Sequence, residues 1–134
     1  MPSIPPQIYI IDDESAVRTA YSRLALSAKM KPLSFASVDE FMKAAVPDEN
    51  ACVVSDIRMP GTSGLELPGL LAKAGRYLPV IFATAHDTAE TREIAQRVGA
   101  AAFFHKPVDG QALLDAIAFA LSKEKAREKD RAPL

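Results

Sequence analysis

The sequence predicts a single α/β domain built on a five-stranded parallel sheet, with helices on both faces. Three observations predict this class. Short apolar segments alternate five times with segments of helical periodicity, and no repeat or linker interrupts them. Three of the strand segments are almost continuously apolar, as expected where helices cover both faces of a parallel sheet. The length of 134 residues suits one domain.

The first half of the chain carries three strand signals and two helix signals. Ser15 is a favoured helix N-cap, and Ser37 with Glu40 resembles a capping box. The segment before Asp56 is a run of small and β-branched residues. In chain order we expect a strand at 7–11, a helix from 15 to about 31, a strand at 33–35, a helix at 38–45 and a strand at 51–55.

The second half repeats the alternation. Pro68 and Gly69 weaken the first of its helix signals, and Gly99 is a typical helix stop. We expect a helix at 65–74, a strand at 79–83, a helix at 88–98, a strand at 101–105 and a helix at 109–121. The chain thus divides into an extended, proline-containing lead-in at 1–6, a domain at 7–121, and a charged tail or helix extension at 122–134.

Composition excludes several classes. The chain is 49% hydrophobic and 25% charged, which is ordinary for a globular protein, and its net charge of −1 argues against direct nucleic-acid binding. A single cysteine, Cys52, allows no internal disulfide. The first seven residues carry no positive side chain and no apolar core, so we do not expect a signal peptide, and no apolar run approaches the ~20 residues of a membrane helix. We therefore expect a soluble cytoplasmic protein with no membrane partner.

Polar residues follow four of the five expected strands. For a doubly wound five-stranded sheet the flavodoxin-like order 2-1-3-4-5 is favoured, and ligands then bind at the carboxyl edge between strands 1 and 3. Asp12 and Asp13 follow the first strand, Asp56 the third, Thr84 the fourth and Lys106 the fifth. One such residue would be an ordinary helix cap, but four strand ends together indicate a binding site.

Three carboxylates at one edge require compensation. Two like charges ~4 Å apart repel by about 4 kcal/mol at an effective dielectric constant of 20. Either one carboxyl is protonated or a cation lies among them, and an all-oxygen ligand set favours Mg²⁺. We expect Lys106 to lie too far along the edge to neutralise all three, but Lys106 and the Thr84 hydroxyl can meet an anion. This arrangement suits a phosphoryl group, with the central Asp56 as nucleophile.

In these motifs the sequence resembles the receiver domain of two-component response regulators, from about residue 8 to 121. The motifs are Asp12-Asp13, Asp56 followed by Ile-Arg-Met-Pro, Thr84-Ala and Lys106-Pro. The resemblance implies that Asp56 accepts phosphate from a sensor histidine kinase or a histidine phosphotransfer protein. It also implies that Mg²⁺ is bound directly by Asp13, by Asp56 and by the backbone carbonyl of Arg58. Asp12 would hold a water molecule that is bound to the metal.

The same resemblance assigns secondary roles. Thr84 and Lys106 would contact the phosphate, and Phe103 would be the switch aromatic, a position where tyrosine is more common. Arg58 and His86 would tune the lifetime of the phosphate. The motifs are most similar to the nitrogen-fixation-type regulators, and a homodimer formed on phosphorylation is a further expectation. The chain is then a stand-alone receiver or the receiver part of a longer regulator.

Other functions remain open alternatives. A phosphorelay shuttle without an output would use the same residues. A Mg²⁺-dependent phosphatase with an aspartyl nucleophile usually needs a carboxylate two residues after it, where this chain has Arg58. A flavodoxin-type cofactor site would need a hydroxyl- or glycine-rich loop after the first strand, where Asp12 and Asp13 would repel a phosphate.

Overall fold

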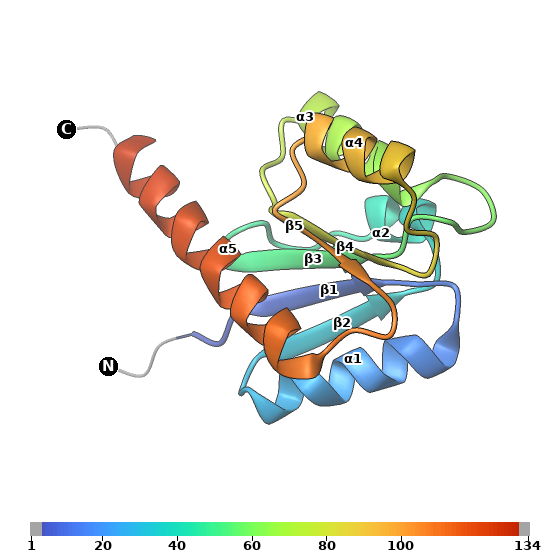
Figure 1. Cartoon of the computed structure of the whole chain (residues 1–134). Coiled ribbons are helices and arrows are strands. Elements are labelled where there is room, and N and C mark those ends of the chain that lie inside the picture. The colour runs from blue at the N-terminus through green and yellow to red at the C-terminus, as the bar shows by residue number, and fades with distance from the viewer. Residues whose placement is uncertain (1–3, 132–134) are drawn as a thin grey trace.

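The computed structural model describes residues 4–131, and the predicted fold class is confirmed. Five parallel strands form one sheet in the order β2-β1-β3-β4-β5, with helices on both faces (Figure 1). Residues 1–3 of the expected lead-in and 132–134 of the expected tail lie outside the described residues. The strands are β1 (Gln7–Ile11), β2 (Lys31–Phe35), β3 (Ala51–Ser55), β4 (Val80–Thr84) and β5 (Ala102–His105).

Burial follows the position of each strand in the sheet. β3 and β4 are buried along their whole length and β1 along all but its first residue, whereas the edge strands β2 and β5 are partly exposed. An edge strand needs fewer apolar residues, which agrees with the mixed sequence Lys-Pro-Leu-Ser-Phe of β2. The register aligns Ile11 with both Phe35 and Ser55, so the carboxyl ends of the central strands lie level.

Two apolar layers enclose the sheet. One, which contains Tyr9, Phe41 and Phe82, lies beneath α2, α3 and α4, and the other, which contains Ile10, Ile81 and Leu113, lies beneath α1 and α5 (Figure 1). Cys52 is buried in the second layer, as expected for a packing residue. The helices are α1 (Ser15–Ser27), α2 (Val38–Lys43), the 3-10 turn η1 (Gly64–Glu66), α3 (Leu67–Lys73), α4 (Ala89–Arg97) and α5 (Gly110–Arg131).

Several helix limits differ from the sequence prediction. Ser15 is the first helical residue and not the cap, because Glu14 occupies the cap position. The expected third helix is divided: a capping box at Ser63 starts η1, and α3 begins only at Leu67, with Pro68 in its first turn, where proline is tolerated.

The last helix continues well beyond Leu121. Residues after Leu121 are good helix formers, and α5 runs through Arg131. The Arg127 guanidinium stacks 3.7 Å above the ring of Tyr77, which ties the extension to the loop before β4. No helix within residues 4–131 is long and apolar enough to cross a membrane.

Candidate functional site

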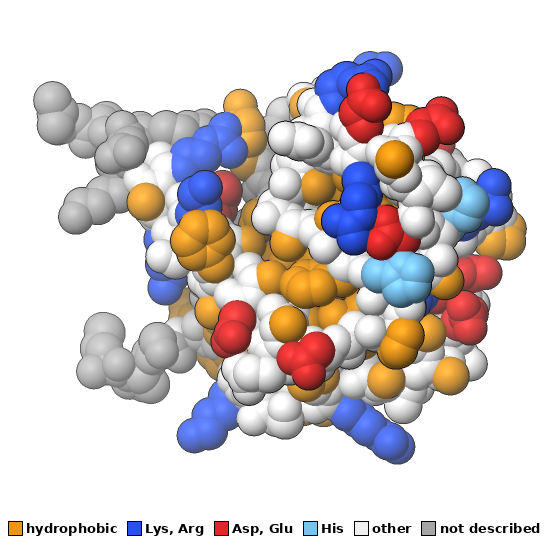
Figure 2. All heavy atoms as spheres, in the orientation of Figure 1, with side chains coloured by type: hydrophobic (Ala, Val, Ile, Leu, Met, Phe, Trp, Pro, Cys, Tyr) orange, Lys and Arg blue, Asp and Glu red, His pale blue; other side chains and the backbone are white. Residues whose placement is uncertain are grey.

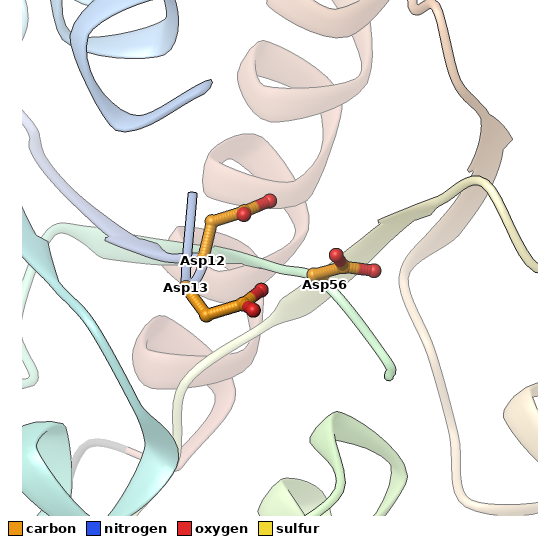
Figure 3. Close-up of side chains that lie close together, drawn as sticks. All are labelled: Asp12, Asp13 and Asp56. Atoms are coloured by element: carbon orange, nitrogen blue, oxygen red, sulfur yellow. The ribbon is translucent and has the colours of Figure 1, made fainter. Parts of the chain in front are cut away.

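Three carboxylates converge at the carboxyl edge of the sheet. Asp12 and Asp13 follow β1, and Asp56 follows the neighbouring β3 (Figure 3). One oxygen from each of the three lies within 4.8 Å of the others. Asp12 and Asp56 are buried, at 1% and 7% exposure, whereas Asp13 is exposed. The sequence predicted that these three side chains lie close together, and they do.

Lys106 lies closer to the carboxylates than the sequence suggested. Its Nζ donates to Oδ2 of Asp12 at 2.7 Å and to Oδ2 of Asp56 at 3.1 Å. Lys106 pairs with two of the three carboxylates and not with Asp13, so the expectation that it cannot neutralise all three is confirmed. It reaches the other two because α5 packs on the same face as α1, so the segment from β5 to α5 crosses back over the edge toward α1 (Figure 1).

The loop after β3 holds Asp56 firmly. Its Oδ1 accepts a hydrogen bond from the Ile57 backbone N–H at 2.7 Å, and its carbonyl accepts one from the Ser55 hydroxyl at 2.8 Å. The Ile57 carbonyl in turn accepts from the Gly64 N–H at 2.9 Å. A Cβ at Gly64 would lie 2.0 Å from the Asp56 carbonyl oxygen, so only glycine allows the loop to fold this closely.

Asp56 remains accessible from solvent. It lines an open cavity of about 330 Å³ together with Asp13, Arg58, Thr84 and His86. Thr84 is buried at the end of β4, and its Oγ1 accepts a hydrogen bond from the His86 N–H at 3.0 Å. Both Arg58 and His86 border this cavity and a neighbouring groove, so the two expected tuning residues lie at the mouth of the site.

The electrostatics of the site reflect its three acids and one base. Burial raises the pKa of Asp12, although the hydrogen bond from Lys106 opposes this. The pKa of Lys106 is raised as well, because hydrogen bonds to Asp12 and Asp56 outweigh the cost of burial. With all four groups ionised, three negative charges face one positive charge, which leaves a formal excess of two negative charges.

That excess suits a divalent cation. The donor set is entirely carboxylate oxygen, and no described His or Cys belongs to it, which favours a hard ion such as Mg²⁺. The Asp13 carboxylate makes no hydrogen bond or ion pair with any described residue, so it is free to bind an ion. These residues fit the metal that the sequence predicted.

A second polar cluster lies beside the site, at the end of β5. Arg92 on α4 forms a two-point ion pair with Asp87, at 2.6 and 2.7 Å, and its guanidinium stacks 4.6 Å from the centroid of the Phe103 ring. His105 Nδ1 lies 3.2 Å from the same Asp87 carboxylate. Figure 2 shows this face, with charged side chains and a histidine above hydrophobic side chains. Phe103 is half-buried and aligns with Phe82 in the register.

Sequence reasoning missed two groups near the carboxylates. Arg18, on the first turns of α1, donates from Nη1 to the Asp12 carbonyl at 2.7 Å. Tyr21 lies one turn further along α1, and burial raises the pKa of its hydroxyl. The charge of Lys106 lowers this pKa, and the charges of Asp12 and Asp56 raise it. The sequence carries no clear signal for Arg18, because the spacing of side chains along a helix does not show that one of them reaches a backbone carbonyl.

A five-stranded doubly wound sheet with an aspartate trio, a threonine and a lysine at its carboxyl edge defines a class of phosphoacceptor signalling domains. Residues 8–118 match the sequence model of the response regulator receiver domain. The chain therefore belongs to the response regulator receiver domain family. Receiver domains are signalling modules of two-component systems: sensor histidine kinases phosphorylate them, and they bind Mg²⁺ at an acidic pocket.

Curated relatives are longer than this chain. Nodulation protein W of Bradyrhizobium diazoefficiens is 31% identical over 91% of the chain and 54% of the relative. The transcriptional regulatory protein FixJ of Azorhizobium caulinodans is 37% identical over 92% of the chain and 59% of the relative. The chain thus spans little more than half the length of these relatives.

Solved structures agree with the fold. The response regulator StyR superposes with a TM-score of 0.83 at 34% identity, over 96% of this chain and 65% of StyR. The crystal structure of FixJ-N superposes with a TM-score of 0.81 at 28% identity, over 90% of this chain and 96% of that one. The similarity to regulators of the nitrogen-fixation type expected from the motifs is consistent with the FixJ matches.

Proposed function

We propose that Asp56 is the phosphoacceptor of a two-component signalling switch and that the transfer depends on Mg²⁺. The observation that carries the proposal is the convergence of Asp12, Asp13 and Asp56 within 4.8 Å, with Lys106 bound to two of them and an open cavity in front of Asp56. The donor is a phosphohistidine on a sensor kinase or a phosphotransfer protein.

The chemistry is a phosphoryl transfer between two side chains. An Oδ atom of Asp56 attacks phosphorus, the P–N bond of the phosphohistidine breaks, and the electron pair of that bond stays on the imidazole nitrogen. Asp13, Asp56 and the Arg58 carbonyl would hold Mg²⁺, and Asp12 would act through water. The ion would neutralise charge on the phosphoryl oxygens. Lys106 is long enough to move from the carboxylates to the transferred phosphoryl group.

The signal would be read on the face formed by β5, α4 and α5. Thr84 ends β4 within the cavity, and the segment that follows it carries Asp87, which is paired to Arg92 on α4. A Thr84 side chain that turns toward the phosphate would pull on this segment and so on the contact between Arg92 and Phe103. The proposal also includes a homodimer formed on phosphorylation. Residues 7–121 would be the receiver unit.

The central experiment is phosphorylation by acetyl phosphate, followed by intact mass. We expect the wild-type chain to gain one phosphoryl group with Mg²⁺ and none with EDTA. The Asp56→Asn variant should stay unmodified, and the Asp39→Asn variant, which changes an exposed carboxylate on α2, should behave as wild type. A folded wild-type chain that gains no mass, or an Asp56→Asn variant that still does, would refute the assignment.

Two assays separate the alternatives. Steady release of phosphate from a phosphate ester would instead indicate a Mg²⁺-dependent phosphatase. Transfer of the phosphoryl group from Asp56 to a histidine phosphotransfer protein, with no change in oligomeric state, would indicate a phosphorelay shuttle. Arg58, which is exposed at the position where such phosphatases carry a carboxylate, argues against the first.

A further inference from the structure

Within the described part of the chain, Asp13 is the one carboxylate of the site that no side chain or backbone group restrains. Asp12 is held by the Glu14 N–H at 2.9 Å and by Lys106, and Asp56 is held by the Ile57 N–H and by Lys106. Among the described residues, Asp13 has no such partner. The direction of its side chain therefore depends on how the backbone on either side of it is fixed.

The Arg18 side chain fixes that backbone on the side before Asp13, because its Nη1 donates to the Asp12 carbonyl at 2.7 Å. On the other side the Glu14 carbonyl accepts the ordinary helical bond from the backbone N–H of residue 18 at 3.2 Å, which any residue there except proline would make. The Asp12 carbonyl and the Asp13 N–H belong to one planar peptide unit, so a bond that holds the carbonyl restrains ψ of Asp12 and φ of Asp13. Because Asp12 is almost fully buried, its carbonyl would be costly to leave unpaired.

We infer that Arg18 is a positioning residue for the cation site: it holds the Asp12–Asp13 peptide so that Asp13 faces Asp56. The inference rests on the proposed function and deepens it. Arg18 lies outside the group of candidate ligands and outside the residues that line the cavity in front of Asp56. It therefore acts through the backbone and not by touching the phosphoryl group.

Charge and positioning predict opposite results for one variant. Arg18 is itself a cation near a cation site, so its charge alone would weaken Mg²⁺ binding, and its removal would strengthen it. If Arg18 holds the peptide, its removal weakens binding. Groups that orient metal ligands typically change affinity by ~10- to 100-fold when they are mutated.

The test is Mg²⁺ titration by calorimetry on the full chain. We expect Arg18→Ala to raise the Mg²⁺ dissociation constant by about tenfold or more. Arg18→Lys, which keeps a charged donor of similar length, should stay within about threefold of wild type. Arg23→Ala is the matched control, because it removes the same charge from an exposed position on α1 and should leave affinity unchanged.

Kinetics and stability distinguish positioning from a general loss of structure. At saturating Mg²⁺ the Arg18→Ala variant should accept phosphate from acetyl phosphate at the wild-type rate, because only its metal affinity is impaired. If Arg18→Ala does not fold, the comparison of Arg18→Lys with Arg18→Gln decides, and we expect the glutamine variant to bind Mg²⁺ more weakly. Equal or tighter Mg²⁺ binding without Arg18 overturns the inference. A wild-type chain that binds no Mg²⁺ refutes the proposed function itself, so the two failures differ.

Discussion

Replacing Lys106 with methionine removes the cation that links two of the carboxylates and keeps most of the side-chain volume. Lys106 is 13% exposed and makes two charged hydrogen bonds, at 2.7 and 3.1 Å. Hydrogen bonds to charged groups contribute roughly 1.5–3 kcal/mol each. Part of the loss is recovered because Asp12, whose pKa is already raised by burial, takes up a proton more easily. We expect the free energy of unfolding without Mg²⁺ to fall by about 2–4 kcal/mol at pH 7.

The loss of stability in the Lys106→Met variant should depend on pH in a definite direction. The folded-state pKa of Lys106 is raised, so its contribution is complete below its ordinary pKa and is lost as pH rises through the folded value. It also requires ionised carboxylates as partners. The difference between wild type and Lys106→Met should therefore be largest near neutral pH and should shrink as pH falls, beginning above the ordinary aspartate value of ~3.9 because the pKa of Asp12 is raised in the folded chain.

Urea unfolding at several pH values, in EDTA and in Mg²⁺, measures these quantities. Added Mg²⁺ should stabilise the methionine variant more than wild type, because the ion replaces the missing positive charge. Lys125→Met is the control, since Lys125 is exposed on α5 and has no polar partner among the described residues. A Lys106→Met chain within about 0.5 kcal/mol of wild type in EDTA at pH 7 would refute the reasoning.

Three other predictions concern the surroundings of the site. Gly64→Ala should lower the free energy of unfolding by at least about 2 kcal/mol, because the new Cβ would lie 2.0 Å from a backbone oxygen. Gly69→Ala should raise the free energy of unfolding by about 0.5–1 kcal/mol, because open space surrounds that position in α3. Urea unfolding of both variants compares the two effects. Burial raises the pKa of the Cys52 thiol to about 12, so we expect no reaction with Ellman's reagent until the chain is unfolded, and rapid labelling of the native protein would contradict this. The hydrogen bond from Arg92 lowers the pKa of Asp87, so the ion pair contributes stability at neutral pH and loses it as pH falls through the folded-state pKa of Asp87. The Asp87→Asn variant should therefore melt at a lower temperature than wild type at pH 7, and the difference should vanish in acid. A difference that persists in acid would exclude the ion pair as its cause.

The sequence predicted the fold and the convergence of the aspartates because both depend on strong local signals. Apolar runs mark the central strands, and parallel strands must bring Asp13 and Asp56 to one edge. The reach of Lys106 across that edge could not be predicted, since it depends on the path of the chain from β5 to α5. The contact of Arg18 with the Asp12 carbonyl could not be predicted either, because every residue has a backbone carbonyl and the sequence does not show which one a side chain will reach.

Helix limits were the least predictable feature, for a related reason. The extension of α5 beyond Leu121 includes Arg127, which stacks on Tyr77, and a contact between residues so far apart in sequence leaves no local signal. The division of the expected third helix into η1 and α3 follows from the capping box at Ser63, which satisfies backbone groups one turn before the α-helix begins.

The direction of α5 has a consequence for how a message can leave the molecule. The helix starts beside the edge that carries Asp56 and ends past the opposite edge of the sheet (Figure 1). With 22 residues it measures ~33 Å, far more than any side chain can reach. No side chain near its distal end can touch Asp56, so an effect of Asp56 on that end would have to pass along the helix or through neighbours such as Tyr77, which Arg127 contacts.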